Sequence, residues 1–344
     1  MTKQMESDGM KIGVVGAGSW GTALSHLLAD KGYPVELWVY EPEVKEQILE
    51  SRENRIFLPG VTLSENLRPS NNISRVVRGK DLLLSVVPSH LVRAIAGQMA
   101  EHISPETTVV SASKGIENGT YLTMSDVLQE MLPSLPAHRF AVLSGPSFAK
   151  EVARRVPTAV TAAAIDRKTA EMVQQTFSTS SFRVYTSGDL IGVELGGAVK
   201  NVIAIAAGII DGLNLGLNTR AALITRGQTE IRRLGLKLGA NPRTFTGLAG
   251  IGDLILTCTG TLSRNHTVGK KIGQGVSLTA ILDEMRMVAE GVKTAKSVYN
   301  LSRKLGVEMP ICKEIYRILY DAVSPKEAVH NLMTRDLKQE LDEY

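Results

Sequence analysis

The sequence has few cysteines and no block of basic residues. Only Cys258 and Cys312 occur among 344 residues, and they form neither a CxxC motif nor a disulfide framework. The 39 basic and 35 acidic residues give a net charge of +4, and the basic residues are dispersed. This composition fits a reducing compartment and excludes a nucleic-acid partner, because nucleic-acid binding needs a concentrated basic surface.

Long hydrophobic runs are also missing. The longest purely apolar run covers residues 202–210, whereas a membrane-spanning helix needs about 20 apolar residues. The first eight residues, MTKQMESD, lack the apolar stretch of a secretory signal peptide. The six histidines show no metal-ligand spacing, and no Ser-His-Asp nucleophile motif occurs. We therefore expect a cytoplasmic protein without membrane insertion and without a metal.

The chain is long for one hydrophobic core, and its pattern changes near Ser187. Before that point, apolar runs at 11–15, 35–39, 81–87, 108–112, 139–143 and 158–164 alternate with helical patterns at 22–30, 90–100 and 122–131. Alternation of this kind predicts a mostly parallel, doubly wound α/β sheet of the Rossmann type. After that point the pattern is helical. We expect a Rossmann-like dinucleotide-binding domain at 1–187 and an all-α substrate domain at 188–344.

A glycine motif follows the first expected strand. Gly16, Gly18 and Gly21 form a GxGxxG sequence between that strand and an amphipathic helix, the context in which the motif indicates a dinucleotide site. Gly16 allows the tight turn, Gly18 allows a pyrophosphate to approach the backbone, and Gly21 allows helix and strand to pack closely. The pyrophosphate would lie at the helix N-terminus, where free N–H groups attract anions. The sequence therefore predicts binding of NAD(H) or NADP(H).

The choice between the two dinucleotides stays open. Glu41, at the end of the second expected strand, is placed to bond a ribose hydroxyl, which favours NAD. Tyr40 stands just before it, and Arg52 and Arg55 follow at a distance from which either would meet a 2′-phosphate.

Three further strands end in small or polar residues, at 85–89, 111–115 and 143–147. Pro88 and Pro146 lack the N–H that would continue a ladder, so they mark where pairing stops. In open α/β sheets ligands bind beyond the carboxyl ends of the strands, so these segments should line one site with the glycine motif. Lys114 is the only cation among them, placed to hold an anionic substrate or to polarise a carbonyl.

The helical half contains one apolar helix with a lysine in it, at 192–208. Gly196 and Gly197 lie on the same face as Lys200, and Ala204 and Ala207 continue that face. We expect a smooth groove that leaves room for a ligand. Because burial of an unpaired ammonium is costly, Lys200 should meet a carboxylate or a substrate.

Two later segments add polar groups. Asp253 follows a glycine-rich loop that allows close approach of the backbone. Arg264 offers a planar fork suited to phosphate, and its neighbours Ser263 and Asn265 are neutral hydrogen-bonding groups.

Several segments together resemble the bacterial NAD(P)-dependent glycerol-3-phosphate dehydrogenases. They are GAGSWGTAL, VVPSH, SASKGIE, LSGPSFAKEV, ELGGAVKNVIAIAAGIIDG, LITRG, LAGIGDLILTCTG, SRN and EGVKTAK, and they span about residues 11–320. The resemblance implies that Lys200 is the general acid/base, with Asp253 and Lys114 as its catalytic partners. It implies substrate contacts from Lys114, Gly145, Ser147, Lys200, Asp253, Ser263, Arg264 and Asn265. Dinucleotide contacts are implied for Gly16, Gly18, Ser19, Trp20, Gly21, Tyr40, Lys114, Ala149, Arg264, Val288 and Glu290. Tyr40 stands where many members carry a basic residue.

The resemblance also implies a reaction, the reduction of dihydroxyacetone phosphate to sn-glycerol 3-phosphate for phospholipid synthesis, by an enzyme that tends to be a homodimer. An ammonium can supply the proton for such a reduction if its pKa falls from about 10.4 toward neutrality. Two alternatives stay open at this point. One is another dehydrogenase with a helical domain, acting on a β-hydroxy acid or 6-phosphogluconate. The other is a regulator that binds the dinucleotide without catalysis.

Overall fold

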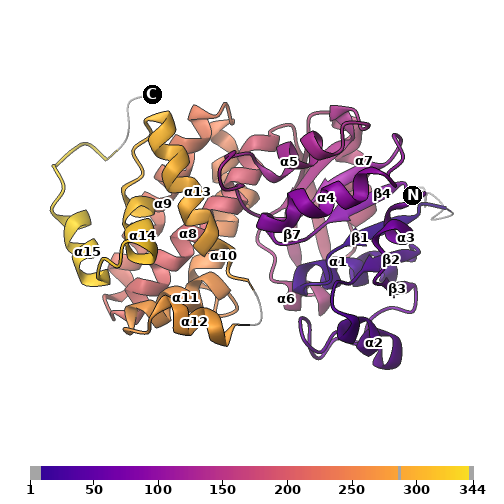
Figure 1. Ribbon diagram of the computed structural model, residues 1–344. Coiled ribbons are helices and arrows are strands. Elements are labelled where there is room, and N and C mark those ends of the chain that lie inside the picture. The colour runs from indigo at the N-terminus through magenta and orange to yellow at the C-terminus, as the bar shows by residue number, and fades with distance from the viewer. Residues whose placement is uncertain (1–8, 286–287, 341–344) are drawn as a thin grey trace.

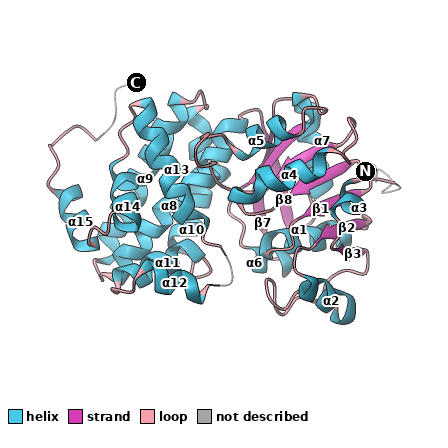
Figure 2. Ribbon diagram, in the orientation of Figure 1, coloured by secondary structure: helices cyan, strands magenta, loops and turns pink. Residues whose placement is uncertain are grey.

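The protein consists of a sheet-containing half followed by a helical half, which lie side by side (Figure 1). The computed structural model describes residues 9–285 and 288–340. The first eight residues, tested above for a signal peptide, lie outside the described residues. All of the strands belong to the first half, as Figure 2 shows.

The first half is built on one eight-stranded sheet of order β3-β2-β1-β4-β5-β6-β7-β8. Its strands are β1 (Ile12–Val15), β2 (Val35–Trp38), β3 (Leu67–Ser70), β4 (Leu82–Ser85), β5 (Thr108–Ser111), β6 (Phe140–Ser144), β7 (Thr158–Ala164) and β8 (Phe182–Ser187). All neighbouring pairs are parallel except β6 and β7. The expected fold class, a mostly parallel Rossmann-like sheet followed by helices, is confirmed.

Two strands were missing from the sequence prediction, β3 and β8, and they are the two edges of the sheet. The sequence of β3 is LRPS, in which Pro69 breaks the apolar pattern; proline is tolerated on an edge strand, where no neighbour needs its N–H. On β8 the side chains of Arg183 and Tyr185 are exposed. Edge strands carry less of the apolar signal by which a buried parallel strand is found.

The central strands bury side chains on both faces of the sheet. Leu82 and Leu84 pack with the core on one side, whereas Leu83 packs with the core on the other side. The first core includes residues of α1 (Ser19–Asp30) and α7 (Arg167–Phe177), and the second includes residues of α3 (Ile73–Val77), α4 (Val92–Ala100) and α5 (Met124–Met131). Successive side chains on a strand point to opposite faces, so a near-continuous apolar strand is what a doubly covered sheet requires.

Two short helices complete the first half, α2 (Pro42–Ser51) and α6 (Ala149–Ala153). The second half contains α8 (Leu190–Gly212), α9 (Gly216–Lys237), α10 (Asp253–Thr259), α11 (Arg264–Gly273), α12 (Leu278–Glu284), α13 (Glu290–Leu305), α14 (Pro310–Tyr320) and α15 (Pro325–Met333). Short 3-10 segments lie at Ser89–Leu91, Ala137–Arg139 and Pro242–Thr246, and a π-helical turn at Leu248–Gly252. Helix α8 is central, since α9, α10, α11, α13 and α14 all pack against it.

Helix α8 is long and apolar enough to cross a membrane by length and composition alone. The run of residues 202–210 understated its length, because Lys200, Asn201 and Glu194 interrupt the apolar letters without ending the helix. Every residue of its most apolar window is buried inside the protein. The helix is therefore the core of the helical half, and Cys258 and Cys312, both unpaired, are buried around it in the same cluster.

Candidate active site

The three glycines of the motif have three different geometries. Gly16 has a φ of +117°, in the left-handed region that favours glycine, and turns the chain after β1. A Cβ on Gly21 would lie 1.9 Å from the carbonyl oxygen of Gly16, so only glycine lets α1 pack this closely. A Cβ on Gly18 would meet nothing within 4 Å, and Gly18 is the uncapped N-terminus of α1. The loop leaves open space where a pyrophosphate needs it.

A residue that the sequence analysis missed holds this loop. Asn54, fully buried after α2, donates through Nδ2 to the oxygen of Ala17 and to the hydroxyl of Thr22, each at 2.9 Å. Its Oδ1 accepts from the N–H of Phe57 at 3.0 Å. No local pattern marks Asn54, because Ala17 and Thr22, which accept from its side chain, precede β2 in the chain.

The two arginines considered for a 2′-phosphate lie in different surroundings. Arg52 donates to the carbonyl oxygen of Leu67 at 3.0 Å and to that of Ser64. It is engaged by backbone, which corrects the expectation that it would be available for a phosphate. Arg55 stays largely exposed, with Glu53 at 3.5 Å. Tyr40, beyond the end of β2, is 75% exposed.

The other residues expected beside the dinucleotide lie around the same loop. Ser19 donates through its hydroxyl to the oxygen of Phe57 at 2.6 Å. The ring of Trp20 packs near that of Phe182, and its buried Nε1 is without a hydrogen-bond partner among the described residues. Ala149 begins α6, which packs against α1.

The three polar strand ends are neighbours in space. Strands β4, β5 and β6 are adjacent in the sheet, and each ends at a serine, Ser85, Ser111 and Ser144 respectively. The loop after β5 carries Lys114. The loop after β6 contains Gly145, with a φ of +150°, and Ser147, whose hydroxyl donates to the oxygen of Gly145 at 2.9 Å.

At this edge two lysines share one buried carboxylate. Lys200 donates to Asp253 Oδ1 at 2.5 Å, and Lys114 donates to Asp253 Oδ2 at 2.7 Å. Asp253 is 1% exposed by side chain, Lys200 7% and Lys114 17%. Lys114 also donates to the oxygen of Gly145 at 3.3 Å. Since Lys114 belongs to the sheet half and Lys200 and Asp253 to the helical half, the cluster joins the two halves.

The ammonium of Lys200 is placed for proton transfer. Its pKa is lowered from 10.5 to about 7, chiefly by burial and also by the charge of Lys114, while the carboxylate of Asp253 acts in the opposite direction. Lys200 also donates to the hydroxyl of Thr257 at 2.8 Å. That hydroxyl in turn donates to the main-chain carbonyl oxygen of Asp253 at 2.6 Å. Thr257 was not among the expected site residues, although its position four residues after Asp253 puts both on one face of α10.

The groove expected along α8 is filled by protein, which corrects that expectation. A Cβ on Gly196 would lie 2.3 Å from the oxygen of Ala249, and one on Gly197 would lie 2.6 Å from the hydroxyl of Ser144. Ala204 and Ala207 are fully buried. The small residues let α8 approach the segment that leads into Asp253 and the end of β6. They position the cluster instead of leaving a space.

The residues expected to hold phosphate lie at the N-terminus of α11. Ser263 is its N-cap, with its hydroxyl accepting from the N–H of His266 at 3.2 Å. Arg264 is exposed, and its Nη1 donates to the oxygen of Val288 at 2.9 Å. Asn265 is buried, and its Oδ1 accepts from the N–H of Gly291 at 2.9 Å.

Glu290 begins α13 and crosses to the sheet half. Its carboxylate accepts from the N–H and hydroxyl of Ser89, at 3.0 and 2.5 Å. Burial raises its pKa, and the bonds from Ser89 lower it. The contact of Glu290 with Ser89 is a second connection between the halves, on the same edge of the sheet as Lys114.

Two family models match the chain. The C-terminal model of NAD-dependent glycerol-3-phosphate dehydrogenase matches residues 189–330, and the N-terminal model matches residues 11–170. A protein of Syntrophobacter fumaroxidans named glycerol-3-phosphate dehydrogenase (NAD(P)+) is 58% identical over 334 residues, 97% of this chain and 98% of the relative. One of a Geobacter species with the same name is 58% identical over 330 residues, 96% of this chain and 98% of the relative. The chain belongs to the NAD-dependent glycerol-3-phosphate dehydrogenase family.

Structural similarity agrees with this membership. The crystal structure of glycerol-3-phosphate dehydrogenase from Coxiella burnetii is similar with a TM-score of 0.91 and 40% identity, covering 95% of this chain and 99% of the other. As a member of the family, the protein is an NAD(P)-dependent oxidoreductase that acts on a CH–OH group. The described residues contain no group of three or more His, Cys, Asp or Glu side chains that would hold a metal ion.

Proposed function

We propose that the protein reduces dihydroxyacetone phosphate to sn-glycerol 3-phosphate, with Lys200 as the general acid. The observation that carries this proposal is the buried contact of Lys200 with Asp253, which Lys114 also joins from the opposite half. A reduction of a ketone needs a hydride at carbon and a proton at oxygen. When bound, the reduced nicotinamide supplies the hydride; the protein's own residues must supply the proton.

Lys200 meets the requirements for that proton. A pKa of about 7 means that the ammonium is populated at neutral pH and yet gives up its proton readily. Its positive charge would also stabilise the alkoxide that develops on the substrate oxygen. Asp253 keeps the ammonium in place, and Thr257 accepts a second hydrogen bond from it. Lys114 would bind the substrate beside it, since its charge is near the same carboxylate.

The phosphate would be bound separately from the ketone. Ser263, Arg264 and Asn265 lie at the start of α11, where the helix N-terminus favours an anion. Gly291 packs against both Asn265 and the oxygen of Asn201, so this end of α11 lies beside the residue that follows Lys200. Gly145 and Ser147 would line the substrate from the sheet half. Arg264 would contact both substrate and dinucleotide.

The dinucleotide would lie along the carboxyl edge of the sheet. Its pyrophosphate would meet the loop of Gly16, Gly18 and Gly21. Further contacts are proposed from Ser19, Trp20, Tyr40, Lys114, Ala149, Arg264, Val288 and Glu290. Both NAD(H) and NADP(H) fit, because Tyr40 and Arg55 are exposed where a ribose phosphate would lie.

Finer assignments belong to the same proposal. Residues 1–187 would be the dinucleotide-binding domain and residues 188–344 the substrate domain. The last strand ends at Ser187 and α8 begins at Leu190, which supports that division. We further propose a cytoplasmic homodimer that supplies glycerophospholipid synthesis, without nucleic-acid or membrane partners.

Steady-state oxidation of NADH and NADPH, measured side by side, tests the proposal. The panel contains dihydroxyacetone phosphate, dihydroxyacetone, a β-keto acid and the oxidised form of 6-phosphogluconate. We expect turnover of the phosphorylated triose alone at low concentration. Absence of turnover with dihydroxyacetone phosphate would refute the proposed substrate, and turnover of a β-keto acid instead would favour the related dehydrogenase class.

A matched pair of lysine variants tests the mechanism. Lys200→Ala should lower kcat by roughly 10²–10⁴, the usual contribution of a general acid. Lys237→Ala, an exposed lysine at the end of α9, should leave kcat unchanged. A dinucleotide sensor without catalysis predicts no turnover in either protein.

A further inference from the structure

The loop that carries Lys114, residues 112–123, connects β5 with α5 and must hold its lysine across the junction of the two halves. Three contacts hold its first part. Ser113 donates to the oxygen of Val87 at 2.6 Å, and the hydroxyl of Ser297 donates to the oxygen of Ile116 at 2.8 Å. Gly115 packs so closely against Ser89 that a Cβ there would lie 2.4 Å from the Cβ of Ser89.

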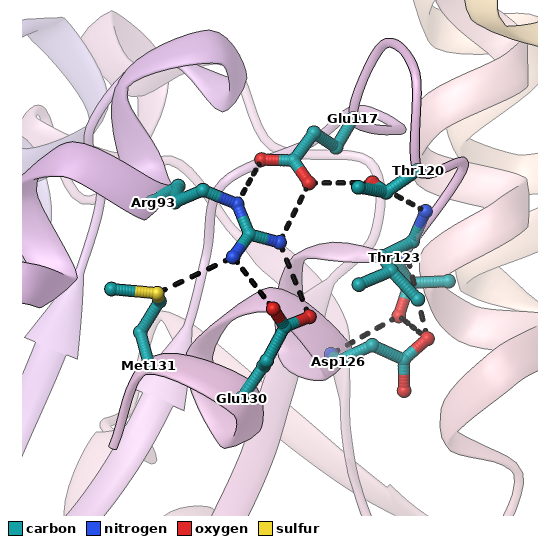
Figure 3. Close-up of polar contacts among 8 residues, drawn as sticks. Arg93, Glu117, Thr120, Thr123, Asp126, Glu130 and Met131 are labelled. Atoms are coloured by element: carbon teal, nitrogen blue, oxygen red, sulfur yellow. Dashed lines mark hydrogen bonds and ion pairs between the residues drawn. The ribbon is translucent and has the colours of Figure 1, made fainter.

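An ion pair outside the cluster holds the next residue of this loop. The guanidinium of Arg93, on α4, lies between Glu117 and Glu130 (Figure 3). Its Nε and Nη2 each donate to one oxygen of Glu117 at 2.9 Å, while Nη1 donates to Glu130 at 2.9 Å. The hydroxyl of Thr120 donates to Glu117 at 2.5 Å from the same loop. A bidentate arginine–carboxylate contact fixes both distance and orientation, which a lysine cannot do.

The two acidic partners of Arg93 lie on different elements and differ in solvent exposure. Glu117 lies three residues after Lys114 and is 15% exposed by side chain, whereas Glu130 lies on α5 and is 55% exposed. Only the contact with Glu117 joins Arg93 to the loop. The bonds of Arg93 hold the pKa of the Glu117 carboxyl below its ordinary value, so Glu117 accepts them as a carboxylate at neutral pH.

We propose that Arg93 and Glu117 are positioning residues, whose bidentate contact fixes the loop so that Lys114 reaches Asp253. This inference rests on the proposed function for its effect on catalysis. Neither residue touches the Lys114–Asp253–Lys200 cluster. They act through the backbone between Glu117 and Lys114.

The consequence is electrostatic. The charged groups that act on Lys200 are Asp253, on α10, and Lys114, on the loop, while the charge of Lys200 acts on the Cys258 thiol on α10. Among them, Lys114 lowers the pKa of Lys200 by its charge. If the loop is released and Lys114 leaves Asp253, the pKa of Lys200 must rise. The pH above which ketone reduction slows should then rise with it, because Lys200 keeps its proton to a higher pH.

Three variants separate this role from a general loss of stability. Glu117→Gln keeps the shape of the side chain and removes its charge, and Arg93→Lys keeps the charge and removes the fork. Glu130→Gln is the matched control, since it makes the same change on the other partner of Arg93 and leaves both bonds to Glu117 in place. Each substitution keeps the approximate size of the side chain, and Arg93 is 32% exposed by side chain, so each variant should fold.

Two measurements are made on each purified protein. The first is the pH profile of kcat/KM for dihydroxyacetone phosphate, with KM for substrate and dinucleotide determined separately. The second is the rate of amine labelling of Lys114, followed by mass spectrometry, with the exposed Lys237 as internal reference; it needs no turnover.

In Glu117→Gln and Arg93→Lys we expect the alkaline limb of the profile to move upward by roughly 0.5–1 pH unit. KM for the ketone should rise several-fold, KM for the dinucleotide should rise less because most of its proposed contacts lie outside the loop, and Lys114 should be labelled several-fold faster. Glu130→Gln should match the wild-type protein throughout. Wild-type labelling rates in Glu117→Gln and Arg93→Lys, or equal changes in all three variants, would overturn the inference. Absence of wild-type turnover would count against the proposed function alone, because the labelling still reports the position of Lys114.

Discussion

Replacing Gly196 by alanine sets two physical effects against each other. Alanine is favoured over glycine by about 1 kcal/mol in a helix interior, so α8 itself should gain stability. The new Cβ would, however, lie 2.3 Å from the oxygen of Ala249, whereas ordinary contact begins at 3.4 Å. The clash is with backbone, which cannot rotate away. We therefore expect the turn at Leu248–Gly252 to move by about 1 Å, and Asp253 follows it directly.

Displacing Asp253 should lower kcat and shift the pH dependence of the reaction. Moving Asp253 from 2.5 Å to about 3.5 Å from Lys200 weakens their attraction by roughly 2 kcal/mol at an effective dielectric constant of about 20. Since Asp253 raises the pKa of Lys200, that pKa should fall by roughly 1.5 units. A misplacement of about 1 Å also lowers kcat by about 10²-fold in well-ordered sites.

The assay is the initial rate of dinucleotide oxidation with dihydroxyacetone phosphate over a range of pH. Gly197→Ala is the control, because the same change one residue later clashes only with the rotatable hydroxyl of Ser144, at 2.6 Å, and meets the Lys114 side chain at an ordinary contact distance of 3.6 Å. Gly196→Ala should lose about 10²-fold in kcat with its alkaline limb moved to lower pH, and Gly197→Ala should stay within a few-fold of the wild-type protein. Equal losses in both variants, or a wild-type profile in Gly196→Ala, would show that close approach at Gly196 does not position Asp253.

Three further predictions follow from the same structure. In the wild-type protein, kcat/KM for ketone reduction should fall as pH rises through about 7, since Lys200 must be protonated, and oxidation of glycerol 3-phosphate should show the opposite dependence; parallel profiles for the two directions would contradict this. Arg264→Ala should raise KM for the phosphorylated ketone with a smaller effect on kcat, and a kcat loss as large as that of Lys200→Ala would exclude this division of roles. Glu230, fully buried on α9, accepts from the N–H groups of Ile311 and Cys312, and burial raises its pKa from 4.5 to about 7. The folded state therefore binds the extra proton between these values, and stability falls by about 3 kcal/mol as pH rises through that window. Glu230→Gln should lose less stability than the wild type between about pH 5 and about pH 8 in urea denaturation; a larger loss would mean that the carboxylate is the favoured form.

Local patterns of apolar residues predicted the inner strands of the sheet. The six inner or long strands were found because apolar residues occupy consecutive positions on strands buried on both faces. The edge strands β3 and β8 were missed, since half-exposed strands do not carry that pattern. The buried helix expected at 192–208 was found, and α8 extends beyond it at both ends, over Leu190–Gly212.

For the site, the sequence predicted the chemistry of individual residues well, but it predicted poorly which residues lie beside them in the folded protein. Lys200 was expected to need a carboxylate because an unpaired ammonium is costly to bury, and it has one. The prediction of a groove beside Lys200 was wrong, because Gly196 and Gly197 accommodate Ala249 and Ser144, which are distant in the chain. Arg52 was kept beside Arg55 as an open alternative for a 2′-phosphate for the same reason: nothing local shows that Arg52 donates to the carbonyls of Ser64 and Leu67.

The sequence by itself determined where the glycine motif turns the backbone, which segments form the inner strands, and which lysine lies on an apolar helix, because those properties depend on residues within a few positions of one another. Only the tertiary structure decided that one carboxylate serves two lysines. Asp253 lies 53 residues from Lys200 and 139 residues from Lys114, and the three meet through the packing of α8 and α10 against the edge of the sheet. The altered pKa of Lys200 comes from that meeting, since burial and the two neighbouring charges exist only when the halves are assembled.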